Sequence, residues 1–543
     1  MKDYLREKVR ASLQALGITQ DLPIIFEKPR QPEHGDLTTN IAMMLAKQVG
    51  RNPRQLATDI VRHLDADPAL LHTPETAGPG FINFRFTRTY FHRELAALLS
   101  ASDTFGRSNV GGGKKTQVEF VSANPTGPLT VGHGRNAVFG DTIATLLEWT
   151  GHDVTREYYF NNAGRQMRML GDSVRLRYLE LLGDQVTFPE DYYQGEYIRE
   201  IAQHLKEQRG DALRNEPAEG AFKEQAEQEI FADIRQTLKR LGIEFRSFFN
   251  ENTLYESGLI REVIDAFKAR DLAYESEGAL WLKAAIIGGE KDKVIVKSSG
   301  EPTYRLPDIA YHIEKFRRGY ELMVDVFGSD HIATYPDVLG GLKALGYDIS
   351  RVKVLIHQFV TILQNGEVVK MSTRKANYIT LDELVDEVGS DVVRYFFLMR
   401  SIASHLNFDL TLAKQQSDEN PVYYLQYAHA RIASILRYAG KEGAQRNKDV
   451  RFELLQASEE MELIRLLLTF PEVVESCASS FEPHRLAEYL HAVAGAFHKF
   501  YHHHRVVGDD ADLTRARLAL CDAVKAVLRN GLTIFGITAP EQM

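Results

Sequence analysis

The stretch QVEFVSANPTGPLTVGHGRNAVFGDTIATLLEWTGHDVTREYYF (residues 117–160) decides the fold. It starts with a short apolar run, passes through a loop punctuated by proline and glycine, and continues with apolar residues at helical spacing. A second strand-like run, HDVTREYYF (152–160), follows the glycine that ends this helix. Strand, helix and strand within about 45 residues predict a parallel, doubly wound (Rossmann-like) sheet of the α/β class. The helical face is formed by Val138, Phe139, Ile143, Leu146 and Leu147.

The rest of the chain predicts further domains around this sheet. A chain of 543 residues exceeds the roughly 250–300 residues that a single hydrophobic core serves. Residues 165–250 form mostly charged helical segments, which are typical of an insertion. Strand-like runs return at 278–284, 293–298, 322–328 and 352–363, and we expect them to complete the sheet.

Four divisions of the chain follow from these patterns. The first hundred residues mix helices with an alternating strand, and the end of the chain has the three- and four-residue apolar spacing of a helix bundle. The expected divisions are an N-terminal α+β domain at 1–105, a Rossmann-like domain at 106–385 with a helical insertion at about 165–285, a connecting segment at 386–420, and a C-terminal helix bundle at 421–543.

Composition excludes several classes of protein. The chain has neither a run of about 20 apolar residues nor the features of a secretory signal, so we expect a cytoplasmic protein without membrane contact. Two cysteines, Cys477 and Cys521, cannot build a disulfide framework, and no ligand spacing predicts a metal site. The central region carries the whole net charge of −9, so indiscriminate coating of nucleic acid is not expected. The nearly neutral ends can still dock RNA through local basic clusters.

The loop before the helix, which we call the first motif, carries the first candidate chemical groups. Free N–H groups and the dipole at a helix start attract phosphate. Gly132 would let the backbone approach a nucleotide, and His133 would donate a hydrogen bond to a phosphate or ribose oxygen. Alone, Thr-x-Gly-His is a weak signal, because a single histidine in this position more often caps or packs the helix.

The second motif is KMSTR, Lys370 to Arg374, which follows the Asn365-Gly366 turn signal. Two cations and a hydroxyl on one loop could neutralise the phosphates of a nucleotide as pyrophosphate leaves. In isolation, a solvated basic loop is the better interpretation of this spacing.

Together, the two motifs resemble the signature sequences of class I aminoacyl-tRNA synthetases. NPTGPLTVGH is similar to the loop that ends in His-x-Gly-His, and KMSTR is similar to the Lys-Met-Ser-Lys-Ser loop. The form is that of the bacterial arginine enzymes, which carry a histidine where this chain has Thr130. A threonine hydroxyl can donate to phosphate but cannot carry a positive charge. The resemblance implies a catalytic set of Thr130, His133, Lys370, Ser372 and Arg374.

The resemblance also implies residues that bind the two small substrates. A guanidinium group requires carboxylates, and Asp308 is the partner that we favour. Asn124 would bind the amino or carboxylate end of arginine. The full arginine-binding set is Glu119, Ser122, Asn124, Tyr304 and Asp308. The implied ATP-binding set is Gly132, His133, Gly328, Asp330, His357, Val360 and Met371.

The reaction and partners follow from the same resemblance, which covers nearly the whole chain. Mg²⁺-ATP and arginine would give arginyl-adenylate and pyrophosphate, and arginine would then pass to the 3′ end of its tRNA with release of AMP. ATP with Mg²⁺ would be a substrate, and no permanently bound cofactor is implied. The N-terminal domain and the C-terminal bundle would contact tRNA, the latter as the anticodon-binding domain, and a monomer is the family expectation.

Two alternatives stay open at this point. Small nucleotidyltransferases such as pantothenate synthetase have a related glycine-histidine loop, but they lack a C-terminal bundle like that expected at 421–543. A catalytically weak paralogue that binds tRNA without charging it is the other alternative, and Thr130 motivates it.

Overall fold

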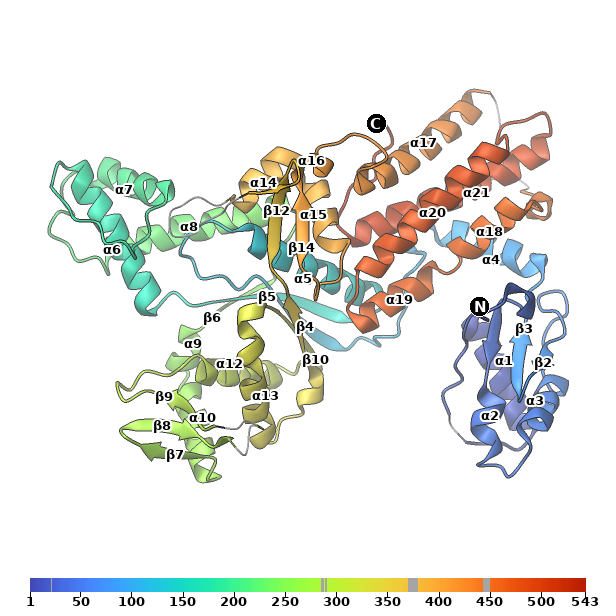
Figure 1. The fold of residues 1–543 in the computed structure, drawn as a ribbon, viewed down its shortest axis with the longest axis horizontal. Helices are drawn as coiled ribbons and strands as arrows, with labels where there is room; N and C mark the ends of the chain where they lie inside the picture. Colours follow the sequence, from blue (N-terminus) through green and yellow to red (C-terminus); the bar gives the residue numbers. More distant parts are fainter. Residues whose placement is uncertain (21, 285–287, 289–290, 370–378, 443–449) are drawn as a thin grey trace. The chain divides into compact units, whose positions relative to one another are not determined.

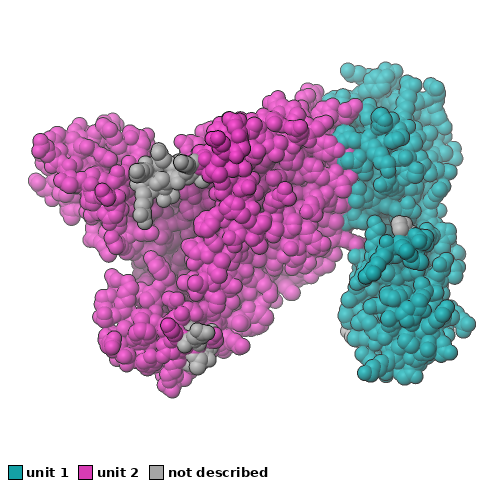
Figure 2. Space-filling model, viewed as in Figure 1, with its two compact units in different colours: residues 1–105, 432–469, 495–527 teal, residues 106–431, 470–494, 528–543 magenta. Residues whose placement is uncertain are grey.

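The structure, a computed structural model, describes residues 1–20, 22–284, 288, 291–369, 379–442 and 450–543. These residues pack into two compact units, each discontinuous in sequence (Figure 2). Unit 1 comprises residues 1–105, 432–469 and 495–527, and unit 2 comprises residues 106–431, 470–494 and 528–543. In the part of the chain that is described, no helix is long and apolar enough to cross a membrane. Three helices are divided between the units: α17 (Pro421–Lys441), α20 (His484–His503) and α21 (Ala511–Ile534).

Unit 1 contains a small α+β region. Its antiparallel sheet has the order β1-β3-β2, and Ile82 and Phe84 of β3 are fully buried. Phe86 and Tyr90 continue this core, with ring centroids 4.1 Å apart. The elements wholly within the unit are α1 (Lys2–Ala15), β1 (Leu37–Thr39), α2 (Ile41–Ala46), α3 (Pro53–Arg62), β2 (Glu75–Ala77), β3 (Phe81–Phe84), α4 (Arg88–Ala101) and α18 (Ser458–Leu467).

Unit 2 is built on a five-stranded parallel sheet with the order β11-β10-β4-β5-β6 (Figure 1). The chain runs outward from β4 to β6, then returns to the other side of β4 through β10 and β11, so the predicted doubly wound sheet is confirmed. The switch point, at which the strand order reverses, lies between β4 and β10, and a ligand site is expected there. The strands are β4 (Lys115–Glu119), β5 (Asp153–Phe160), β6 (Ser247–Asn250), β10 (Leu322–Gly328) and β11 (Val352–His357).

Helices and two small sheets complete unit 2. The sheet β7-β8-β9 is antiparallel, and in the sheet β13-β12-β14 the strands β12 and β14 are parallel. The small-sheet strands are β7 (Ala273–Ser276), β8 (Ala279–Leu282), β9 (Lys293–Val296), β12 (Val360–Gln364), β13 (Glu367–Val368) and β14 (Leu406–Asp409). The helices are α5 (Val131–Trp149), α6 (Gly164–Leu181), α7 (Glu196–Arg209), α8 (Ala221–Arg240), α9 (Asn252–Glu256), α10 (Leu259–Ala269), α12 (Arg305–Arg317), α13 (Tyr335–Ala344), α14 (Leu381–Val388), α15 (Ser390–Leu398), α16 (Leu410–Ala413) and α19 (Phe470–Ser480).

The assignment of strands to the main sheet was wrong in three places. The runs at 278–284 and 293–298 form β8 and β9 of the separate antiparallel sheet. Glu277 and Gly278, with φ of 52° and 75°, form the tight turn that pairs β8 with β7 instead. The run at 352–363 divides into β11, which joins the main sheet, and β12, which does not. Strand β6, inside the predicted insertion, is the edge strand that the sequence did not reveal.

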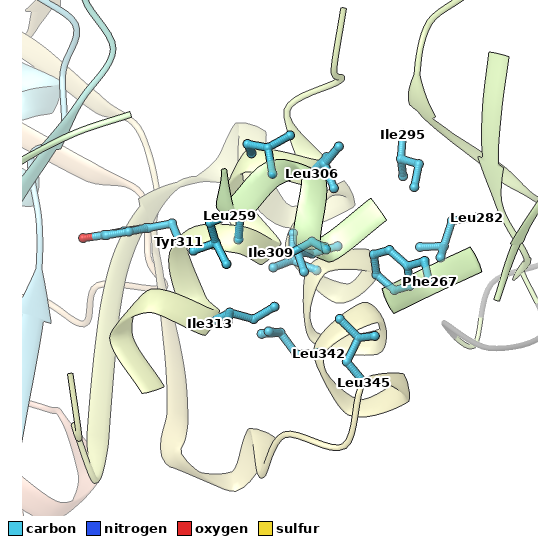
Figure 3. Close-up of a cluster of buried hydrophobic side chains, with 14 of the residues drawn as sticks. Leu259, Phe267, Leu282, Ile295, Leu306, Ile309, Tyr311, Ile313, Leu342 and Leu345 are labelled. Carbon is cyan, nitrogen blue, oxygen red and sulfur yellow. The ribbon is translucent and has the colours of Figure 1, made fainter. Parts of the chain in front are cut away.

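A hydrophobic cluster beneath α12 fixes the orientation of that helix. Figure 3 shows Leu306, Ile309 and Ile313 of α12 in this cluster, while the hydroxyl of Tyr311 points away from it. Phe267, one of their partners, is fully buried, and burial of each such side chain contributes roughly 1.5–3 kcal/mol. Because these apolar positions face the cluster, Asp308, His312 and Lys315 share another face of the helix.

Within unit 2, a buried guanidinium ties the segment after α21 to helices that pack around the main sheet. Arg394 on α15 donates to Asp141 Oδ2 and to the carbonyl oxygen of Leu241, both at 2.7 Å. It also donates to the carbonyl oxygen of Phe535, and Gly536 lies so close that a Cβ there would be 2.6 Å from the guanidinium carbon. Helices α5, α8 and α15 are thereby joined to the segment after α21.

The close contact between α5 and the sheet gives a test of this packing. A Cβ at Gly140 would lie 2.3 Å from Cγ of the buried Phe120, so Gly140→Ala should overpack the interface and destabilise the protein by about 1–3 kcal/mol. Urea denaturation measures the change. Gly440→Ala, with no atom within 4 Å of the new Cβ, should instead stabilise α17 slightly. Equal effects of the two substitutions would contradict the described packing.

Candidate active site

The switch point is closed by a single amide side chain. Asn136 of α5 accepts a hydrogen bond from the N–H of Val121 at 2.7 Å and donates to the carbonyl oxygen of Val326 in β10 at 2.8 Å. Val121 and Ser122 both have positive φ, 65° and 44°, which is costly for a β-branched valine. The strained turn after β4 is therefore held in place by Asn136 and directs the chain into the first motif.

The first motif forms a reciprocal cap at the start of α5. Thr130 is the N-cap residue, and its hydroxyl accepts from the N–H of His133 at 3.5 Å. In return, the N–H of Thr130 donates to Nδ1 of His133 at 3.2 Å. Burial lowers the pKa of His133, which keeps the ring neutral. Because Nδ1 is an acceptor, the ring proton is on Nε2, where it can be donated to a ligand.

Three predicted ATP-binding residues lie together at the ends of β10 and β11. Gly328 is the register partner of His357, and a Cβ at Gly328 would be 2.4 Å from Oδ1 of Asp330. Burial lowers the pKa of His357 to about 4, and the charge of Asp330 acts on both His133 and His357. Val360 begins β12 close in sequence to this cluster, and Phe359 before it is 69% exposed.

A buried arginine connects the first motif to the turn after β11. Arg135 donates to the carbonyl oxygens of Gln358 at 2.8 Å, Ser404 at 2.9 Å and Ser401 at 3.0 Å. Desolvation lowers its pKa to about 10, so it stays charged at neutral pH. The segment that carries His357 and Val360 is thus held at a defined distance from His133.

The second motif, with Lys370, Met371, Ser372 and Arg374, lies outside the described residues. The segment that follows it docks on the first motif: the N–H of Leu381 donates to the carbonyl oxygen of Leu129 at 2.8 Å, and Thr380 forms a β-bridge with Thr130. A Cβ at Gly134 would lie 2.5 Å from Cδ1 of Leu381. The beginning of α14 therefore packs directly on the beginning of α5.

Buried charges fill the space between α12 and the sheet. Lys315 donates to Glu119 Oε2 and to Asp325 Oδ1, both at 2.6 Å. Burial alone would raise the pKa of Asp325, but Lys315 and His312 lower it well below its usual value. Burial raises the pKa of Glu119 despite the attraction of Lys315, and Ser122 donates to its second oxygen at 3.0 Å. Glu119 is 3% exposed and has partners on both oxygens.

Two further carboxyl groups, those of Asp308 and Glu251, form no ion pair in the described part of the chain. Burial raises the pKa of Asp308 to about 7, and Glu119 and Glu251 add to this shift. Burial also raises the pKa of Glu251, although Tyr159 donates to it at 2.7 Å. The charges of Glu251 and Asp308 both raise the pKa of Tyr159, so the three groups lie near one another in an acidic cluster that we call the acidic pocket. Such a pocket suits a cation that can donate to several oxygens.

Glu251 is the residue that sequence reasoning missed. It directly follows β6, so it lies at the C-terminal edge of the sheet, where ligands of parallel sheets bind. Recognition of β6 as a sheet strand would have pointed to Glu251, but the four-residue strand follows a long helical segment and gives little signal.

The remaining predicted arginine-binding residues differ in their placement. Asn124 accepts from the N–H of Asn161 and donates to Gln166, both at 3.0 Å, while Ser122 accepts from the N–H of Tyr159 at 3.2 Å. Ser122 and Asn124 therefore lie at the same end of the sheet as Asp308. Tyr304, the N-cap residue of α12, is 81% exposed and points into solvent instead of the acidic pocket.

The geometry and a family match define the class of protein. A sequence model described as "tRNA synthetases class I (R), catalytic domain" matches residues 94–395, which include the switch point, the first motif and the acidic pocket. Models described as "Arginyl tRNA synthetase N terminal domain" and "DALR anticodon binding domain" match residues 3–86 and 425–543. The chain belongs to the arginyl-tRNA synthetase family, the arginine–tRNA ligases of class I.

Relatives along the full length support the same assignment. The chain is 51% identical to the arginine–tRNA ligase of Salinibacter ruber over 100% of both chains. It is 52% identical to that of Desulfotalea psychrophila, over 95% of this chain and 94% of the other. The arginyl-tRNA synthetase of Thermus thermophilus has the same fold, with a TM-score of 0.76 at 22% identity over 100% of both chains. The resemblance seen in the two motifs is therefore confirmed.

Substitution of the buried Lys315 tests whether this residue neutralises Glu119 and Asp325. Lys315→Met leaves Glu119 and Asp325 without their cation, which should cost about 3–5 kcal/mol of stability at about pH 8. Without Lys315, burial holds the pKa of Glu119 above its unfolded value, so the folded variant binds more protons and regains stability as the pH falls. Urea unfolding at about pH 8 and about pH 5.5 measures both effects.

The exposed Lys343 on α13 provides the matched control, because Lys343→Met removes the same charge without breaking a described ion pair. It should change the free energy of unfolding by less than about 0.5 kcal/mol at either pH. A Lys315→Met variant that is equally destabilised at both pH values would contradict the assigned role of the two carboxylates.

Proposed function

We propose that Asp308 and Glu251 bind the guanidinium group of arginine in this ligase, with the first motif beside them activating the bound amino acid with ATP. The observation that carries the proposal is the pair of half-buried carboxyl groups of Asp308 and Glu251, which form no ion pair among the described residues and both lie close to Tyr159. A planar guanidinium offers five N–H donors, enough to serve both carboxylates. Charging arginine onto tRNA is the activity of the family to which the chain belongs.

The other members of the predicted arginine set act around this pair. Asn124 and Ser122 lie where the α-amino end of arginine would be held, and Asp308 also lines a small cavity with Phe327 and His331 next to the ATP-binding cluster. Glu119 acts through its partners: it holds Ser122 and keeps Lys315 beneath the pocket. Tyr304 stands outside this set in the described conformation, at the first turn of α12.

ATP would bind across the switch point. Gly132 and Gly328 allow close approach of backbone to the nucleotide, and Nε2 of neutral His133 donates to an oxygen of the phosphates. Asp330, His357 and Val360 would contact ribose and adenine, and the exposed ring of Phe359 offers a stacking surface. Lys370, Met371, Ser372 and Arg374 of the second motif would supply the charge and the contacts for departing pyrophosphate. Thr130 acts as the cap that orients His133.

Mg²⁺ would arrive with the phosphates of ATP and not in a cage of side chains. Among the described residues, no group of three or more His, Cys, Asp or Glu side chains could hold a metal ion. Mg²⁺ is commonly bound by substrate phosphates with one or two carboxylates, and Asp330 is a carboxylate of the ATP-binding cluster. When bound, the ion would offset the negative charge of the phosphates.

The partner of the second step is an arginine-accepting tRNA. We assign the tRNA contacts to the N-terminal domain at 1–105 and to the helix bundle at 421–543, in line with the family models that match there. A monomer in the cytoplasm is the form in which we expect the enzyme to act, as its family implies. The alternative of a paralogue that binds tRNA without charging it finds no support among the relatives.

Substitution of the paired carboxylates tests the arginine pocket. Asp308→Asn and Glu251→Gln each remove one charged acceptor, so each should raise the KM for arginine by roughly 10- to 100-fold, because a charge-assisted hydrogen bond contributes about 1.5–3 kcal/mol. The KM for ATP should stay within about twofold. Steady-state formation of arginyl-tRNA measures both constants.

The exposed carboxylate Glu277, in the turn between β7 and β8, is the control, and Glu277→Gln should leave both constants unchanged. If Glu251→Gln raised the KM for ATP as much as that for arginine, Glu251 would not belong to the arginine pocket. An effect confined to Asp308→Asn would leave only one carboxylate in the proposed pair.

The raised pKa of Asp308 predicts a pH dependence of arginine binding. Below pH about 7 the carboxyl group of Asp308 is mostly protonated in the free enzyme and loses its attraction for guanidinium. The value of kcat/KM for arginine should therefore rise with pH through an inflection near 7 and then level off. Asp308→Asn should remove this inflection. A wild-type profile without an inflection between about pH 6 and about pH 8 would contradict the environment assigned to Asp308.

A further inference from the structure

Helix α8 makes an ion-pair contact with α14 at its C-terminal end. Figure 1 shows α8 extending from α6 and α7 toward α14, and α8 and α14 both belong to unit 2. Arg240, the last residue of α8, donates to Asp382 Oδ1 at 2.5 Å and also to Asp386 Oδ1. Thr237, one turn earlier, donates to the second oxygen of Asp382. The end of α8 is thereby fixed to two carboxylates of α14.

The carboxylates of α14 create a need for cations along this helix. It has only eight residues, and a helix of that length is marginal on its own. Asp382 and Asp386 are four residues apart, so their like charges lie on one face and destabilise the helix. Asp386 and Glu387 also lie near its C-terminus, where the helix dipole disfavours negative charge. Arg240 offsets the charge of Asp386, and Lys414, whose Nζ is 2.6 Å from Glu387 Oε1, offsets the other.

The start of α14 is paired with the start of α5. Both helices begin with a capping box whose N-cap residue is a threonine, Thr380 in α14 and Thr130 in α5. The two N-cap threonines form a β-bridge with each other. Leu381, which is fully buried, donates from its N–H to the carbonyl oxygen of Leu129 at 2.8 Å. A displacement of α14 would therefore move the cap that orients His133.

Arg240 differs from an ordinary surface ion pair in what it holds. An isolated exposed pair contributes little to stability, because solvent screens it and ordering the side chains costs entropy. The side chain of Arg240 is 34% exposed, and its planar fork serves two carboxylates at once. Its partner Asp382 directly follows Leu381, the residue that docks on the first motif. The effect of this contact should therefore appear at the first motif as well as in stability.

We propose that Arg240 is a positioning residue for the ATP site. By holding Asp382 and Asp386 it fixes the start of α14 and, through it, the capped first motif with His133. This inference rests on the proposed function, in which His133 donates to the phosphates of ATP. The acidic pocket is formed by residues of β5, of α12 and of the segment between β6 and α9, and not by residues of α14. Loss of Arg240 should therefore weaken the use of ATP more than the use of arginine.

The experiment is steady-state formation of arginyl-tRNA by the full chain carrying Arg240→Gln, which removes the charge and keeps a polar side chain. The KM for ATP should rise roughly 2- to 30-fold, the range for substitutions that act on a site without touching its ligand. The KM for arginine should stay within about twofold. Arg240→Lys restores the charge but not the planar fork, so it should give an intermediate KM for ATP.

A double-mutant cycle separates this role from a general loss of stability. Asp382→Asn breaks the same contact and should raise the KM for ATP by a similar factor. The double variant should resemble the more affected single variant, well below the product of the two effects. Arg261→Gln on α10 is the matched control, because Arg261 and Asp265 form an ion pair at 3.3 Å with side chains 79% and 59% exposed. It should leave both constants at their wild-type values.

The proposal is overturned if Arg240→Gln leaves the KM for ATP unchanged, raises both KM values equally, or lowers kcat alone, as a smaller fraction of folded enzyme would. It is also overturned if the effects of Arg240→Gln and Asp382→Asn multiply. If Arg240→Gln does not fold, Thr237→Val removes only the hydroxyl that holds Asp382 and should give the same selective rise, smaller in size. The absence of that rise would equally overturn the proposal.

His133→Gln tests the proposed function separately. If this variant changes neither kcat nor the KM for ATP, the ATP site itself is wrongly assigned. If His133→Gln impairs the use of ATP and Arg240→Gln does not, only the positioning role of Arg240 is wrong.

Discussion

The site depends on one amide group, the side chain of Asn136, which bonds simultaneously to the ends of β4 and β10. At the switch point of a doubly wound sheet the two strands diverge, and their terminal backbone groups lose their neighbours. An unpaired N–H or C=O in the interior costs about as much as a lost hydrogen bond, so Asn136 satisfies both and stabilises the strained turn at Val121 and Ser122. The residues that we assign to ATP and to arginine are positioned around the two strand ends that Asn136 joins.

The charged residues around α12 form two groups, one that stabilises the fold and one that we propose binds arginine. In the first group Lys315 neutralises Glu119 and Asp325, and each of these residues has close partners. In the second group Asp308 and Glu251 have no such cation among the described residues, and burial raises the pKa of each. In the proposed function, a guanidinium would supply the positive charge that this pair of carboxyl groups lacks. The same proposal accounts for specificity, since a neutral side chain would leave both carboxyl groups unsatisfied.

The sequence was informative where local pattern and chemistry coincide. The βαβ unit of residues 117–160 was predicted correctly, and the five apolar residues assigned to one face of α5 are all buried, although this helix is buried on nearly all sides. The partners of β8 and β9 were not predicted correctly, since the sequence of a short apolar strand does not indicate which sheet the strand joins. Missing β6 also hid Glu251, which only its place after that strand reveals. Tyr304 shows the opposite limit: its spacing from Asp308 placed it on the right helix, but spacing does not determine where a side chain points.

The buried guanidinium of Arg394 has a consequence for the order in which the enzyme matures. Its acceptors come from α5, from the end of α8 and from Phe535 after α21, so the last of them is synthesised long after the others. A nascent chain that already contains both motifs would hold a buried arginine with an unmet donor. The catalytic unit, which includes residues 528–543, therefore reaches its final packing only after the bundle helices have been made.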